Sequence, residues 1–179
     1  RILPPGTLLV NETQSSSVAK PQVIRIDACL KRNFEAGREL SRLFRCAPER
    51  YGLRRERDIA YRKGARPDQT LDVYRPKHGS STLPVVIYFH GGSFRILSKD
   101  SHWPMAVLYG RAGFVVVNVN YRLGPHHPFP APLEDALAAY AWTLRHVAGF
   151  GGDPSQIILA GESAGANLAC SLAIASCFE

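Results

Sequence analysis

The sequence predicts an α/β fold in which helices cover both faces of a mostly parallel sheet. Two apolar runs, at residues 85–89 and 114–120, are continuous, which is typical of strands buried on both faces of a parallel sheet. A third run, at 157–160, precedes an Ala- and Leu-rich stretch at 164–175 that favours a helix. Strands therefore alternate with helices, and no internal repeat or low-complexity tract interrupts them.

The first part of the chain lacks this alternation. Residues 1–20 are rich in Ser, Pro and Thr without periodicity, which indicates a loose arm. Residues 22–47 have apolar side chains at helical spacing and predict one or two amphipathic helices. These helices either cap a pocket or simply pack on the core. We therefore divide the chain into an N-terminal arm with a helical, cap-like segment, residues 1–57, and an α/β domain, residues 58–179.

Four further elements complete the predicted domain. Residues 58–62 and 71–75 alternate between polar and apolar side chains, as half-buried strands do, and turn residues separate them, so a hairpin is expected. Residues 101–112 predict a short helix that Gly113 ends. Residues 133–148 predict the clearest helix, with one apolar face and acidic residues in its first turn.

Composition excludes several classes of protein. The 179 residues are 45% hydrophobic and contain no run of eighteen apolar residues, so no transmembrane helix is expected. Of the net charge of +7, residues 1–66 contribute +8, with 15 Lys and Arg against 7 Asp and Glu, and residues 67–179 contribute −1. The signs are mixed within the basic part, so a solvated face, not nucleic-acid binding, is expected. The four cysteines and six histidines show no metal-ligand spacing, so we expect no bound metal. We expect the cysteines to be free thiols and the protein to be cytoplasmic.

The strongest local motif is Gly161-Glu162-Ser163-Ala164-Gly165. An apolar strand precedes it and a helix follows it, so the serine occupies a sharp strand-to-helix turn that needs small neighbours. Backbone N–H groups and the helix dipole at such a turn stabilise a developing oxyanion. The motif therefore predicts a nucleophile elbow with Ser163 as the nucleophile.

A second motif, His90-Gly91-Gly92-Ser93, follows the apolar run at 85–89. In a parallel sheet this loop leaves the same edge as the elbow, and paired glycines let backbone N–H groups point into a cleft. An H-G-G loop about seventy residues before G-x-S-x-G resembles the α/β-hydrolase superfamily, specifically carboxylesterases of the hormone-sensitive-lipase-like branch.

The resemblance covers roughly residues 58–179 and includes several other motifs. These are Leu71-Asp72-Val73-Tyr74-Arg75-Pro76, Tyr121-Arg122-Leu123-Gly124-Pro125, Pro128-Phe129-Pro130-Ala131, Glu134-Asp135 and Gly152-Asp153-Pro154. Two positions depart from it, because the family usually has Ala at Gly124 and Glu at His126. What the resemblance implies is the α/β-hydrolase fold and hydrolysis of a small-molecule ester through an acyl-enzyme, without a cofactor.

The resemblance also implies roles for the two motifs. Ser163 would attack the ester carbonyl, and the N–H groups of Gly91, Gly92 and Ala164 would form the oxyanion hole. Gly161 and Gly165 would give the elbow its geometry. His90 would brace the loop with a neutral ring, and Glu162 would be a neighbouring brace or a pocket wall. Phe94, Trp103, Met105 and Phe129 either line an apolar pocket or belong to the core, and we expect at least two of them in the core.

The acid and histidine of the triad follow the serine in this superfamily, but no His or Asp follows Ser163. We therefore expect the chain to be the N-terminal part of an α/β hydrolase, with later strands absent and the remainder supplied by a second chain or a missing segment. Three alternatives are a noncatalytic small-molecule binding protein resembling gibberellin receptors, an amide hydrolase resembling arylformamidases, and a truncated product with no function of its own.

Overall fold

The computed structural model describes residues 48–78 and 82–176, so the helices expected within 22–47 lie outside the described residues. Its elements are η1 (Pro48–Tyr51), β1 (Leu53–Ala60), β2 (Thr70–Pro76), β3 (Leu83–Phe89), α2 (Trp103–Arg111), β4 (Val115–Val119), α3 (Ala131–His146), η2 (Val147–Phe150), β5 (Gly152–Gly161) and α4 (Ala164–Ala175). None of the described helices is long and apolar enough to cross a membrane.

The five described strands form one sheet in the order β1-β2-β4-β3-β5. β3 pairs in parallel with both β4 and β5, whereas β2 pairs antiparallel with β1 and β4. All of these strands except β2 therefore run in one direction, which confirms the mostly parallel sheet. The carboxyl ends of β3 and β5 lie at the same edge.

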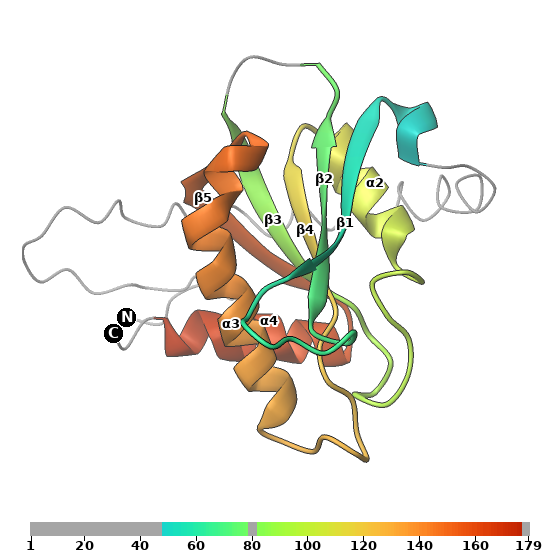
Figure 1. The fold of residues 1–179 in the computed structure, drawn as a ribbon, viewed down its shortest axis with the longest axis vertical. Helices are drawn as coiled ribbons and strands as arrows, with labels where there is room; N and C mark the ends of the chain where they lie inside the picture. The colour runs from blue at the N-terminus through green and yellow to red at the C-terminus, as the bar shows by residue number, and fades with distance from the viewer. Residues whose placement is uncertain (1–47, 79–81, 177–179) are drawn as a thin grey trace, which may run out of the picture.

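Helices cover both faces of the sheet, as predicted (Figure 1). Alternate residues of β3 point to opposite faces: Val85, Ile87 and Phe89 belong to the core under α3 and α4, while Val86 and Tyr88 belong to the core under α2. This split follows from the period of two along a strand. It explains why the whole run is apolar.

The predicted hairpin is confirmed, but its first strand begins earlier than expected, at Leu53 instead of residue 58. The register between β1 and β2 shifts between Glu56 and Ile59. Asp58 lies in this bulge with φ of 55°, and its N–H donates to the carboxylate of Asp72 at 2.9 Å. The strand therefore reaches into the segment that the sequence assigned to the N-terminal arm.

The remaining boundaries differ little from expectation. The helix predicted at 133–148 is α3 followed by η2, and α2 and α4 occupy the stretches predicted for them. Gly151, whose φ is 79°, forms the turn before β5, which begins at Gly152. β5 is an edge strand of the described sheet, and its last residues are only half-buried.

Candidate active site

Ser163 lies where β5 turns into α4. Its backbone has φ of 50° and ψ of −116°, a conformation that non-glycine residues rarely adopt, and the residue is exposed. A Cβ on Gly165 would lie 2.0 Å from the carbonyl oxygen of Phe89, and one on Gly161 would lie 2.5 Å from the carbonyl carbon of Gly165. The backbones of β3, β5 and α4 thus approach so closely that only glycine fits on either side of the serine.

The loop that contains Gly91 and Gly92 lies directly against this turn. Phe89 pairs with Gly161 in the parallel register of β3 and β5, so the residues that follow the two strands leave the sheet side by side. A Cβ on Gly91 would lie 3.1 Å from the carbonyl oxygen of Glu162. The structure therefore brings the predicted oxyanion loop and the residue before Ser163 into contact.

Gly92 turns the loop sharply. Its φ is +115°, and a Cβ there would lie 2.1 Å from the carbonyl oxygen of Ile96. Its own carbonyl oxygen accepts hydrogen bonds from the N–H groups of Arg95 and Ile96, at 2.9 and 3.1 Å. A side chain at position 92 would break this turn, so the second glycine of the motif is required by geometry.

The segment after β4 supports the oxyanion loop from the other side. The Tyr121 hydroxyl donates to the carbonyl oxygen of His90 at 2.6 Å, and the Gly124 N–H donates to the carbonyl oxygen of Phe94 at 2.7 Å. A Cβ on Gly124 would lie 3.5 Å from that same oxygen, an ordinary contact. Glycine at position 124 is therefore a sterically neutral departure from the usual alanine.

His90 is buried beneath the loop and is stacked on Tyr121, with ring centroids 4.4 Å apart. Its Nδ1–H donates to the carbonyl oxygen of Gly91 at 2.7 Å, and Nε2 has no partner among the described residues. Burial lowers the pKa of His90 to about 4, although the hydrogen bond to Gly91 opposes the shift. The ring is therefore neutral at pH 7.

Glu162 contacts a residue whose role sequence reasoning missed. His102 occupies the N-cap position of α2 without a side-chain capping hydrogen bond, and its Nε2 lies 2.6 Å from Oε1 of Glu162. The sequence placed His102 correctly at a helix start. Nothing local indicated its partner, because the two residues are 60 positions apart in the chain.

A cavity of about 410 Å³ lies beside the oxyanion loop. Its walls come from residues 93–95, from the segment between Gly124 and Leu133, and from one side of α4, where Asn167 and Leu168 contribute. Asn167 is one helical turn from Ser163, and its N–H donates to the Ser163 carbonyl oxygen. The cavity is thus a neighbour of the candidate nucleophile.

The structure places all four side chains that were expected in a pocket or in the core. Phe94 and Phe129 line the cavity, and Phe94 also packs against the core under α3 and α4, whereas Trp103 and Met105 pack against the core under α2. The expectation that at least two of them belong to the core is confirmed. Among the described residues, no group of three or more His, Cys, Asp or Glu side chains is arranged to hold a metal ion.

Comparisons with known proteins agree with this arrangement. A family model described as the alpha/beta hydrolase fold matches residues 86–178. The carboxylesterase NlhH of Mycobacterium tuberculosis is 41% identical over 119 residues, which are 66% of this chain and 37% of that protein. Tuliposide A-converting enzyme 2 of Tulipa gesneriana is 42% identical over 100 residues, which are 50% of this chain and 26% of that enzyme.

Solved structures are similar over most of the described fold. The metagenomic carboxylesterase EstE1 is 30% identical with a TM-score of 0.63, and the match covers 84% of this chain and 49% of EstE1. Esterase B from Lactobacillus rhamnosis is 25% identical with a TM-score of 0.68, covering 83% of this chain and 47% of the esterase. The chain therefore spans about half the length of these esterases and 37% of the length of NlhH.

Proposed function

We propose that this chain, which belongs to the α/β-hydrolase family, carries the nucleophile and the oxyanion hole of a serine carboxylesterase. The observation that carries the proposal is the conformation of Ser163. An exposed serine with φ of 50° stands at a strand-to-helix turn, with the Gly91-Gly92 loop packed against the preceding residue. A fold gains no stability from such a strained turn, whereas a nucleophile needs its exposure.

In the proposed reaction the Ser163 hydroxyl oxygen attacks the ester carbonyl. The N–H groups of Gly91, Gly92 and Ala164 donate to the oxyanion that forms, the alcohol leaves, and water then releases the acid from the acyl-enzyme. Each such donor is worth about a hundredfold or more in rate. No cofactor is needed, because a serine and fixed dipoles suffice for ester cleavage.

The hydroxyl of Ser163 requires a general base, and the two histidines nearest the motifs are poorly suited to the task. The ring of His90 is buried with its Nδ1–H bound to Gly91, and the ring of His102 is engaged by Glu162. The family order is serine, acid, histidine. The proposal therefore assigns the acid and the base to sequence outside these 179 residues, in a longer chain or in a second polypeptide.

The cavity beside the loop suits the apolar part of a small ester. Phe94, Phe129, Leu133 and Leu168 give it large apolar walls. Its volume of about 410 Å³ lies at the lower end of the range of small-molecule sites. Short to medium acyl groups, such as butyryl, are therefore the proposed substrates.

The test combines hydrolysis of p-nitrophenyl butyrate with the intact mass of the same sample under denaturing conditions. Hydrolysis that the Ser163→Ala variant abolishes, together with a larger mass or a second polypeptide, supports the proposal. A single 19.7 kDa species that neither cleaves the ester nor reacts with a fluorophosphonate refutes catalysis by this chain. Binding of the intact ester by that inert species would favour a ligand-binding protein instead.

A further inference from the structure

The carboxylate of Glu162 lies close to the proposed oxyanion hole. A Cβ on Gly91 would lie 3.2 Å from Oε1 of Glu162, so the carboxylate packs directly on this glycine. Glu162 immediately precedes Ser163, so this contact places the elbow against the Gly91 loop. A partner that fixes the Glu162 side chain would therefore help to hold the elbow against the loop.

His102 is placed to be that partner. Its side chain is only 11% exposed, and its two nitrogens both face oxygens. Nδ1 lies 3.0 Å from the carbonyl oxygen of Ser98, and Nε2 lies 2.6 Å from Oε1 of Glu162. A carboxylate only accepts hydrogen bonds, so Nε2–H donates to Glu162, while Nδ1 also lies 2.9 Å from the hydroxyl oxygen of Ser101.

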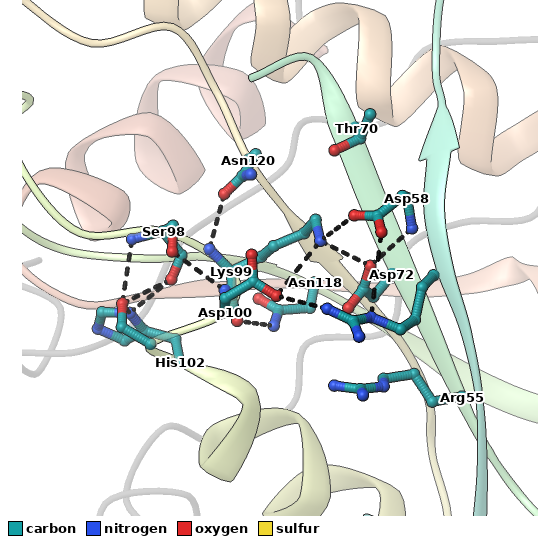
Figure 2. A network of polar contacts seen from close by, with 12 residues as sticks. Arg55, Asp58, Thr70, Asp72, Ser98, Lys99, Asp100, His102, Asn118 and Asn120 are labelled. Atoms are coloured by element: carbon teal, nitrogen blue, oxygen red, sulfur yellow. Dashed lines mark hydrogen bonds and ion pairs between the residues drawn. The ribbon is translucent and has the colours of Figure 1, made fainter. Parts of the chain in front are cut away.

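The segment that carries His102 is fixed to the end of β4 (Figure 2). The Lys99 N–H donates to the side-chain oxygen of Asn120 at 2.7 Å, and the side-chain amide of Asn118 donates to the Lys99 carbonyl oxygen at 2.9 Å. The same carbonyl oxygen accepts the His102 N–H at 3.2 Å. The backbone around His102 is therefore held by the sheet itself.

The Lys99 side chain adds a buried ionic anchor to the hairpin. The Lys99 side chain is 1% exposed, and its ammonium nitrogen lies 2.7 Å from a carboxylate oxygen of Asp58 and 2.9 Å from one of Asp72. Figure 2 shows both contacts. Burial disfavours the charged ammonium, but hydrogen bonds to Asp58 and Asp72 outweigh this and raise the pKa of Lys99. Residues 98–102 are thereby tied to both β2 and β4.

We infer that His102 is a positioning residue that holds the elbow against the oxyanion loop through its hydrogen bond to Glu162. The inference rests on the proposed function, because the position of Ser163 matters only if it attacks. His102 acts through Glu162 and needs no contact with the substrate. The residues from Ser98 to His102 form the rigid base from which it acts.

The test measures the rate at which an excess of a fluorophosphonate modifies Ser163 in the protein that also carries the acid and the base of the proposed function, followed by intact mass at several reagent concentrations. The His102→Asn variant retains a donor near Nδ1 but cannot reach Glu162, whereas His102→Gln retains a donor near Nε2. We expect His102→Asn to lower the maximal rate about tenfold, equivalent to ~1.4 kcal/mol. The half-saturating concentration should not change, and His102→Gln should restore most of the rate. The matched control is His146→Asn, because His146 is exposed at the end of α3.

Glu162→Ala provides a second test that does not depend on the folding of the His102 variant, since the Glu162 side chain is 53% exposed. Glu162→Ala should lower the maximal rate of Ser163 modification by about the same factor as His102→Asn. The double variant should be no slower than either single variant, because both substitutions remove the same hydrogen bond between His102 and Glu162. The inference is overturned, and the proposed function left standing, if the rate losses of the two single variants multiply in the double variant. A His102→Asn rate equal to that of wild type has the same meaning. A wild-type chain that remains unmodified overturns the proposed function and the inference together.

Discussion

His90 should make the stability of this fold sensitive to acid. Its imidazole is buried against Tyr121 with its Nδ1–H bound to Gly91, and its pKa is about 4, below the ordinary value of 6.5. As pH falls through 6.5 the unfolded chain takes up a proton at this ring, while the folded chain does so only near pH 4. Protons thus bind preferentially to the unfolded state, and acid lowers the free energy of unfolding.

The size of this effect follows from the two pKa values of His90. The linkage relation gives a loss of about 2 kcal/mol between pH 7 and pH 5 and about 3 kcal/mol by pH 4. Above pH 7 the contribution of the ring is nearly constant. The loss is a large part of the ~5–15 kcal/mol by which typical domains are stable.

Urea unfolding at several pH values checks this prediction. The His90→Asn variant retains a donor for the Gly91 carbonyl and does not titrate, so it should be less stable at pH 7 but lose less stability in acid. The wild-type advantage should shrink by about 2 kcal/mol between pH 7 and pH 5. His146→Asn, at an exposed position, serves as the control. Parallel pH profiles for wild type and His90→Asn would refute the buried, neutral histidine.

Two further substitutions test the packing of the site. Gly165→Ala should lower the free energy of unfolding by at least ~3 kcal/mol, measured by thermal or urea unfolding, because its Cβ would collide with the carbonyl oxygen of Phe89. The control is Gly149→Ala, whose Cβ would meet nothing within 4 Å, and it should change that free energy by less than ~0.5 kcal/mol. Lys99→Met should lower the free energy of unfolding by about 3–5 kcal/mol, because it leaves the buried carboxylate of Asp72 unpaired. The control is Asp100→Asn, at a half-exposed side chain, and it should lower that free energy by less than ~1 kcal/mol. Equal stability of the two variants in either pair would contradict the structure.

The core of the fold was predictable because it rests on local patterns. Continuous apolar runs became β3 and β4, and the turn that contains Ser163 joined a strand to a helix as expected. The resemblance to carboxylesterases of the α/β-hydrolase family is confirmed by the family model and by the relatives. Adjacent parallel strands release their loops at one edge, so the meeting of the Gly91 loop with the elbow also followed from topology.

β1 was predicted too short for a physical reason. It lies at an edge of the described sheet, and of its eight residues only Leu53 is buried. Its charged stretch from Arg54 to Arg57 therefore shows no apolar alternation, which is the signal that identifies half-buried strands. Backbone pairing with β2, not side-chain burial, forms this part of the strand.

The contacts around Lys99 and His102 have no local signature at all. A lysine among polar residues is expected on the surface, and only the convergence of Asp58 and Asp72 from two other strands makes its burial tolerable. His102 meets Glu162 because β3 lies between β4 and β5 in the sheet, which brings the segment after β3 alongside the turn after β5. Such pairs become predictable only once the strand order is known. The strand order thus carries information about the site that the motifs themselves do not contain.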